Sequence, residues 1–124
     1  MTRPCVRRTF LFLASLSLLL SATACKEKVA VESLSVSLLN TDRYRHPTVG
    51  GDEEGARISM QATHYSVSEI RRDSETNWVA TYVYQPTAGY TGTDDVELEI
   101  LSSADGATAP QLTKKVRLHF LIHE

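Results

Sequence analysis

Apolar and polar residues alternate along most of the chain beyond residue 29, and this alternation restricts the fold more than any other feature. From Ser33 to Leu38 each serine is followed by leucine or valine, so an extended strand would carry its apolar side chains on one face. The same period of two returns in Ala56–His64, Asp94–Ser102 and Leu112–Ile122. An amphipathic helix needs apolar residues three and four apart, and that spacing is almost absent here. The sequence therefore predicts an all-β fold.

Irregular segments interrupt the alternation and predict where strands bend or end. Val31 has the opposite parity to the residues that follow it, which predicts a bulge or a change of sheet near Glu32–Ser33. Asn40–Gly55 is polar and contains a proline and two adjacent glycines, so we expect a long loop there. Ser66–Arg72 fits either a short helix that starts with a capping box or, as we prefer, a short edge strand. Asp105-Gly106 is a hairpin signal.

Asn77–Gln85 has the highest β propensity in the chain and is apolar on both faces, which predicts a central strand. Core packing is our preferred interpretation of its three large aromatic residues, and a platform that stacks on sugars is the alternative. These residues are Trp78, Tyr82 and Tyr84. Other apolar residues fall on outer faces, where loops could cover them or a partner could bind. They are Val79, Val83 and Leu121.

Six or seven short strands separated by turns predict one domain made of two packed sheets. We expect an antiparallel β-sandwich that spans residues 29–124.

The start of the chain has the features of a secretory signal that is cleaved after residue 24. Three arginines precede the apolar run Phe10–Leu20, and small residues follow it. This run has eleven residues, whereas a helix needs about 20 apolar residues to cross a bilayer. We therefore interpret residues 1–24 as a signal peptide rather than a membrane span. Cys5 would be lost with it.

The segment Ala22-Thr23-Ala24-Cys25 resembles the lipobox of bacterial lipoproteins. The resemblance implies that Cys25 becomes the first residue, carries three acyl chains and anchors the protein in a membrane of the bacterial cell envelope. Several acyl chains hold a protein far more firmly than one. Residues 25–28 would then form the lipidated cysteine and a short tether. Lys26, in place of an aspartate that signals retention at the inner membrane, favours the outer membrane; an ordinary signal peptide with a coincidental cysteine is the alternative.

Charge and cysteine content exclude some classes of protein. The whole chain has a net charge of −2, and loss of the three arginines of residues 1–24 leaves −5. Proteins that bind nucleic acid need a basic face, so we expect no nucleic-acid partner. With Cys5 removed and Cys25 acylated, no disulfide is available, and stability must come from a packed core.

One segment, Pro86-Thr87-Ala88-Gly89-Tyr90-Thr91-Gly92-Thr93-Asp94, is informative at each position. Pro86 cannot donate to a strand ladder and so ends a strand. Gly89 and Gly92 allow a positive φ in a tight corner. Tyr90 can bury its ring and bond its hydroxyl to nearby backbone. Asp94 can accept backbone N–H groups within the turn.

The same segment resembles a stretch of bacterial immunoglobulin-like and cadherin-like domains, with the pattern P-x-x-G-Y-x-G-x-D. In those domains it joins two strands across the sandwich, and the tyrosine lies at the corner. The resemblance implies that Pro86, Gly89, Tyr90, Gly92 and Asp94 form a structural corner of an Ig-like or cadherin-like sandwich. Val96 and Leu98 stand where aromatic residues are usual in those domains, and the chain has a single such module.

No motif for catalysis is present, and we expect neither an enzyme nor a bound cofactor. The sequence has no G-x-S-x-G, and Gly50-Gly51 lacks the lysine and helix of a phosphate-binding loop. His119 and His123 would be about 13 Å apart on a strand and could not share a metal ion. A site that combines one of them with His46 or His64 is an alternative.

A calcium site is a further alternative at two acidic clusters. Asp52-Glu53-Glu54 and Asp94-Asp95 supply carboxylates but lack the spacing of a calcium loop, and we interpret them as a charged loop and a turn cap. We expect no metal site.

Three functional hypotheses follow. The first is an anchored, non-catalytic Ig-like module that binds a protein or polymer of the envelope. The second is a structural or accessory subunit of an envelope assembly. The third is a protein that binds a glycan or a metal ion.

Overall fold

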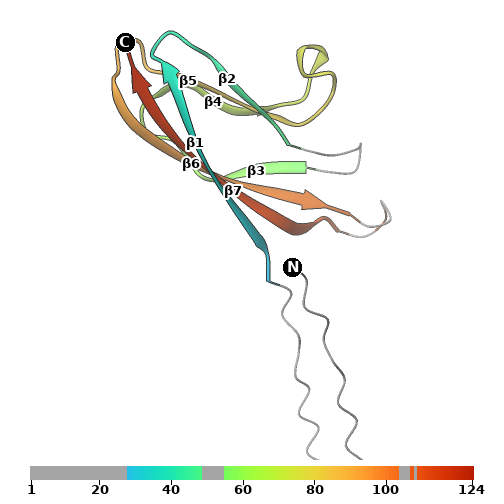
Figure 1. The fold of residues 1–124 in the computed structure, drawn as a ribbon. Coiled ribbons are helices and arrows are strands. Elements are labelled where there is room, and N and C mark those ends of the chain that lie inside the picture. The colour runs from blue at the N-terminus through green and yellow to red at the C-terminus, as the bar shows by residue number, and fades with distance from the viewer. Residues whose placement is uncertain (1–27, 49–54, 104–106, 108) are drawn as a thin grey trace, which may run out of the picture.

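The computed structural model describes residues 28–48, 55–103, 107 and 109–124. These residues form seven strands and one 3-10 turn, arranged in two sheets (Figure 1). The elements are β1 (Ala30–Leu39), β2 (Tyr44–Pro47), β3 (Gly55–Met60), β4 (Tyr65–Arg71), η1 (Ser74–Thr76), β5 (Thr81–Pro86), β6 (Gly92–Ser102) and β7 (Gln111–His123). The prediction of an all-β fold is confirmed. In the described ranges, no helix is long and apolar enough to cross a membrane.

The larger sheet has the strand order β1-β7-β6-β3, and the smaller has the order β2-β5-β4. β1 runs parallel to β7, from Ala30 opposite Lys114 to Leu39 opposite His123. The expectation of antiparallel strands throughout is therefore wrong at this pair. Alternation determines which side chains face the core, but it does not distinguish the two directions of pairing. A parallel pair needs a long connection, and here the rest of the domain provides it.

The register also defines two ends of the domain. Ala30 lies beside Lys114 at one end, which we call the entry end. Gly92 lies beside Ile122 at the other, which we call the far end. In Figure 1 the C-terminus is at the far end, and β1 rises toward it from the entry end.

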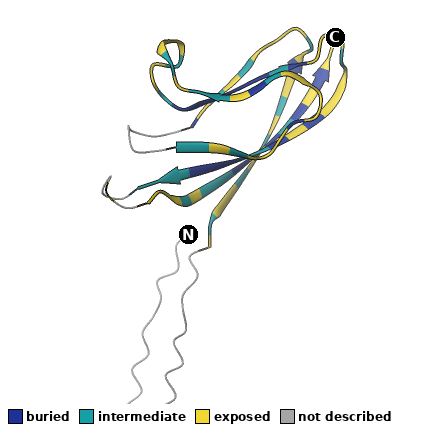
Figure 2. Cartoon of the chain, turned by 180° about the vertical axis from the view of Figure 1, so that it is seen from behind, coloured by how far each residue is buried: buried dark blue, intermediate teal, exposed yellow. Residues whose placement is uncertain are grey.

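The core lies between the two sheets and follows the predicted alternation. The even-numbered apolar residues Val96–Ile100 of β6 and Val116–Ile122 of β7 are buried, whereas most odd-numbered residues of these strands are exposed or intermediate (Figure 2). Tyr84 of the smaller sheet stacks on Phe120 of the larger one, with ring centroids 4.0 Å apart. The buried cluster comprises Leu38, Ala62, Tyr82, Tyr84, Val96, Leu98, Ile100, Val116, Leu118, Phe120 and Ile122.

Several local expectations need correction. The strand β2 lies within Asn40–Gly55, which was expected to be a loop. A four-residue edge strand that ends in proline gives too short a pattern to recognise. The register of β1 with β7 is continuous and β1 stays in one sheet, so both the bulge and the change of sheet expected near Glu32–Ser33 are wrong. A bulge occurs instead between Ile58 and Met60, and Met60, whose parity predicted a core position, is 49% exposed.

The predictions for the smaller sheet are confirmed in part. The edge strand preferred for Ser66–Arg72 is found as β4 at Tyr65–Arg71, so the helical alternative is wrong. β5 is central, but it begins at Thr81, because Asn77 and Trp78 have positive φ angles and end the turn after η1. Val83 is 1% exposed between Arg45 and Glu69 of its neighbour strands, rather than on an open outer face.

The two other apolar residues expected on outer faces differ in exposure. Val79 is partly buried, and Leu121 is exposed. β6 and β7 pair as an antiparallel hairpin. The turn signal Asp105-Gly106 falls outside the described residues.

Candidate binding groove

An open groove of about 720 Å³ lies beside the first half of β6, at the far end. β3 pairs with β6 only as far as Met60, which lies opposite Glu97. Beyond Met60 the chain leaves the larger sheet and crosses to β4 in the smaller one through residues 61–64. The first residues of β6 therefore have β7 on one side and the groove on the other. Its lining includes Met60, His64, Tyr90, Asp95, Glu97 and Arg117.

Asp94 joins the two sides of the groove from beneath. The residue is 3% exposed, and its carboxylate accepts the backbone N–H groups of Thr63 and His64, each at 2.8 Å. The hydroxyls of Tyr84 and Thr63 donate to the same carboxylate at 2.8 and 3.1 Å. The sequence predicted that Asp94 would accept N–H groups from its own turn. Most of the donors found lie instead on the crossing between β3 and β4 or on the smaller sheet. Asp94 thus fixes the crossing chain to both sheets.

These hydrogen bonds determine the charge of Asp94. Burial acts to raise its pKa, but the N–H groups of Thr63 and His64 and the Tyr84 hydroxyl outweigh burial, so the pKa lies below its ordinary value. Burial raises the pKa of Tyr84, and its hydrogen bond to Asp94 raises it further. At neutral pH the pair is therefore an ionised carboxylate and a neutral phenol.

Tyr90 and His64 together form one wall of the groove. The two rings are stacked, with centroids 4.1 Å apart and planes 10° apart. The Tyr90 hydroxyl donates to the carbonyl of Thr93 at 2.7 Å. Gly92 has φ of 138°, and a Cβ built there would lie 2.8 Å from the Tyr90 hydroxyl oxygen, so a side chain at Gly92 would collide with this arrangement.

Side chains occupy backbone groups along the unpaired part of β6, and this hinders another strand from pairing there. The Thr93 carbonyl is taken by Tyr90, and the Asp95 N–H donates to the Asp94 carboxylate at 3.0 Å. Backbone groups of alternate residues point the same way, so Thr93 and Asp95 both face the groove. With these groups occupied, the groove offers side chains to a ligand more than free backbone.

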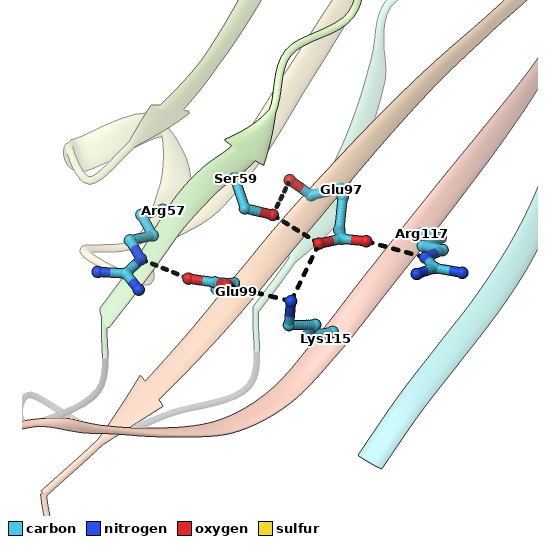
Figure 3. Close-up of polar contacts among 6 residues, drawn as sticks. All are labelled: Arg57, Ser59, Glu97, Glu99, Lys115 and Arg117. Atoms are coloured by element: carbon cyan, nitrogen blue, oxygen red, sulfur yellow. Dashed lines mark hydrogen bonds and ion pairs between the residues drawn. The ribbon is translucent and has the colours of Figure 1, made fainter. Parts of the chain in front are cut away.

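A network of charges forms the outer rim of the groove and continues across the outer face of the larger sheet (Figure 3). Glu97 accepts hydrogen bonds from Arg117 at 2.8 Å, from Ser59 at 2.9 Å and from Lys115 at 3.3 Å. The hydrogen bond from Arg117, followed by that from Ser59, lowers the pKa of Glu97 to about 2. Arg117 itself stays 61% exposed in its side chain, which leaves it accessible to a ligand.

The network extends to Glu99, away from the groove. Glu99 accepts from Arg57 at 2.5 Å and lies 3.4 Å from Lys115. The hydrogen bond from Arg57 is the main cause that lowers the pKa of Glu99. Lys115 therefore bridges two carboxylates on one strand, which holds the rim of the groove in place.

The remaining residues of the predicted corner lie near the groove but do not line it. Pro86 is fully buried at the end of β5, opposite Tyr65 of β4. Gly89 has φ of 76° in the turn that leads to Tyr90. Cys25 falls outside the described residues.

The aromatic residues that could have formed a sugar platform are separated. Tyr82 and Tyr84 are fully buried, whereas Trp78 is 64% exposed on the turn after η1. The core interpretation therefore holds for the two tyrosines and is wrong for Trp78. Sequence alone could not show that the backbone at Trp78 adopts φ of 62°, which takes this residue out of the strand.

The histidines are distributed over separate places. His119 contacts Asp95 at 2.6 Å, and His123 contacts Ser37 at 3.0 Å, both on the outer face. His46 lies near Tyr44 on β2, and burial lowers its pKa. Among the described residues, no three side chains of His, Cys, Asp or Glu lie close enough to hold a metal ion. The cluster Asp52-Glu53-Glu54 lies outside those residues.

The groove residues Met60 and Arg117 were missed by the sequence analysis. Met60 followed the parity of a core residue, and Arg117 was one outward charge among many. The alternation did not mark the opening, because it continues to His64 whereas β3 ends at Met60.

Comparisons with known proteins do not assign this chain to a family. No family model and no curated protein matches the sequence. A cysteine protease inhibitor from Entamoeba histolytica has a similar structure, with a TM-score of 0.45 and 13% identity over 79% of this chain and 100% of the inhibitor. A sialyltransferase from Photobacterium damsela has a TM-score of 0.39 and 7% identity over 76% of this chain and 18% of the transferase. Likenesses this distant carry no functional argument.

Proposed function

We propose that this chain is a lipid-anchored protein of the bacterial cell envelope whose Ig-like domain binds a protein or polymer in the groove beside β6. The position of the groove carries the proposal. The proposed tether joins β1 at Ala30, beside Lys114, whereas Thr93 in the groove lies beside Leu121. Seven residues of β7 separate these points, which corresponds to about 23 Å along the strand. A tether that joins at Ala30 would therefore leave the groove unobstructed.

The order of the strands supports the assignment to Ig-like sandwiches. In an immunoglobulin constant domain, strands B, E and D form part of one sheet, and C, F and G form the other. If the seven strands are lettered A to G in chain order, the smaller sheet β2-β5-β4 has the order B-E-D. The strands β7-β6-β3 of the larger sheet then have the order G-F-C. β1 would then be a first strand that pairs with the last.

The charge states in the groove favour binding over catalysis. A general acid must hold a proton at the working pH, and a general base must be free to accept one. The lowered pKa values of Asp94 and Glu97 leave both carboxylates ionised, and their oxygens are occupied by hydrogen bonds from Tyr84 and Arg117 among others. These two carboxylates therefore stay charged and hydrogen-bonded, which suits recognition.

The lining indicates the kind of ligand. Met60 offers a flexible apolar contact at one wall, and the stacked rings of His64 and Tyr90 offer a rigid one. Arg117 and Asp95 place opposite charges at the rim. We propose an extended segment with apolar and charged groups, held mainly through its side chains.

Photo-crosslinking of the full chain in the envelope tests the groove. A photoreactive phenylalanine at position 60 should form an adduct with an envelope component, since the Met60 side chain is 49% exposed at the wall. The same group at position 78 is the control, because Trp78 is 64% exposed on the turn after η1 and does not line the groove. No adduct from position 60, or the same adducts from both positions, would contradict the proposal.

The anchor needs a separate test. Cys25→Ser in the full chain should abolish incorporation of a labelled fatty acid and release the protein from the membrane fraction. Incorporation that persists in this variant, or membrane retention without any label in the unchanged chain, would exclude acylation at Cys25.

A further inference from the structure

One edge of the larger sheet is an unpaired strand. β1 pairs with β7, and no other described strand pairs with its opposite edge. The direction of its backbone groups follows from the end of the strand, where the Asn40 N–H donates to the His123 carbonyl at 2.8 Å. Alternate residues point the same way, so the even-numbered residues of β1 bond to β7, and the odd-numbered residues face the open edge. The Leu39 N–H agrees with this, because it donates to the Asp42 carboxylate at 3.1 Å.

This edge lacks the usual features that prevent strands from pairing. Natural edge strands are protected by lysine, proline, bulges or very short length. β1 is ten residues long, contains no lysine or proline, and keeps a continuous register with β7. Its outer face carries the small side chains of Ser33, Ser35 and Ser37. Glu32 is its sole charge, and it forms an ion pair with Lys114 of the same chain.

The sequence of β1 is self-complementary about Ser35. If a second β1 lies antiparallel with Ser35 opposite Ser35, then Ser33 lies opposite Ser37, and Leu34 lies opposite Val36. Val31 and Leu39, which are 54% and 40% exposed, fall opposite each other at both ends. In this register the odd-numbered residues of one copy lie opposite the odd-numbered residues of the other, and both sets face the open edge. The hydrogen-bonded pairs of an antiparallel ladder require this arrangement.

We propose that two copies of this chain associate through β1, in antiparallel register centred on Ser35. The two larger sheets then form one continuous sheet with two-fold symmetry, as in most homodimers. The pairs 33–37, 35–35 and 37–33 exchange backbone hydrogen bonds. The ladder stops before Leu39, because the N–H and carbonyl of Leu39 are both used in the turn with Asp42. No like charges meet across the pair.

Disulfide trapping of the full chain in intact cells tests the register. Opposed residues of a hydrogen-bonded pair have Cα atoms about 5.5 Å apart, within the range that a disulfide spans. Ser35→Cys should therefore give a covalent dimer under mild oxidation. Ser33→Cys is the matched control, since the two copies of residue 33 would be about 13 Å apart along the strands. The double variant Ser33→Cys/Ser37→Cys should restore the dimer. The unchanged chain controls for Cys5 and Cys25.

A second variant tests association without a cross-link. Ser35→Pro removes an N–H that faces the open edge and not β7, so the fold should persist while the pairing is lost. Sedimentation velocity in detergent should then show a dimer for the unchanged chain and a monomer for this variant. Equal cross-linking of Ser35→Cys and Ser33→Cys, cross-linking of Ser35→Cys to a different protein, or a monomeric unchanged chain would overturn the proposal. None of these readouts depends on acylation or on the groove.

Discussion

Replacing Asp94 by asparagine changes one oxygen to an NH₂ group and leaves the size of the side chain almost unchanged. In the structure the two carboxylate oxygens accept from different groups, one from Thr63 and the other from His64 and Tyr84. An amide can keep one side only. If its oxygen remains with Thr63, its NH₂ group faces the His64 N–H, and two donors then oppose each other in a buried place.

The expected cost follows from these contacts. A buried donor left without a partner costs about 1–3 kcal/mol, and hydrogen bonds to a charged acceptor are worth about 1.5–3 kcal/mol each against about 1 kcal/mol for neutral ones. We expect Asp94→Asn to lower the free energy of unfolding by about 3 kcal/mol in total. A domain of this size has about 5–15 kcal/mol, and the melting temperature should fall by about 15 °C.

The pH dependence gives the prediction a specific signature. The pKa of Asp94 is lower in the folded chain than its ordinary value of 3.8, so folding favours the ionised carboxylate. This stabilisation is complete well above pH 3.8 and is lost as the pH falls through the folded pKa. The difference in stability between the unchanged chain and Asp94→Asn should therefore be constant near neutral pH and shrink below pH 4.

Urea unfolding followed by circular dichroism, repeated across pH, measures this difference. Asp95→Asn is the matched control, because it makes the same chemical change at the next residue, whose side chain is 57% exposed and contacts His119. An exposed pair of this kind is worth about 0–1 kcal/mol. Equal effects of the two substitutions, or an Asp94→Asn effect that stays constant to pH 3, would refute the account of the carboxylate as an ionised link between the sheets.

Five other substitutions test the packing. Gly92→Ala should destabilise the fold by about 1–3 kcal/mol in thermal unfolding, since its Cβ meets the Tyr90 hydroxyl, and Tyr90→Phe in the same chain should recover part of this loss. Trp78→Gly should raise the melting temperature slightly, because glycine adopts φ of 62° without strain; a lower value would mean that the indole makes stabilising contacts. Leu98→Ala should cost about 2–5 kcal/mol and Leu121→Ala below about 1 kcal/mol, and similar values for both would contradict the assigned burial.

The parts of the fold that follow from alternation could be predicted from the sequence. The inward set Val96, Leu98 and Ile100 on β6 needed only a period of two. The direction of β1 did not follow, because the side-chain pattern of a strand is the same whether its neighbour runs parallel or antiparallel. The outward position of Met60 did not follow either, because a bulge shifts parity at a place that the sequence does not mark.

The groove itself could not be predicted from the sequence. The roles of Gly92 and Asp94 in a turn could be inferred from their chemistry, whereas the partners Thr63 and His64 lie some thirty residues away in the chain. A contact across sheets depends on where β3 stops and which way the chain then crosses. These are properties of the tertiary structure, and no local propensity encodes them.

The parallel pairing of β1 and β7 also determines how the domain would respond to mechanical force. A chain held at the N-terminal end of β1 and pulled from the C-terminal end of β7 has its two terminal strands drawn past each other along their length. All the hydrogen bonds between them then share the load in shear and must break together rather than one after another. Because forced unfolding is governed by the height of this barrier, a domain fixed to a surface at one end would resist traction on the other.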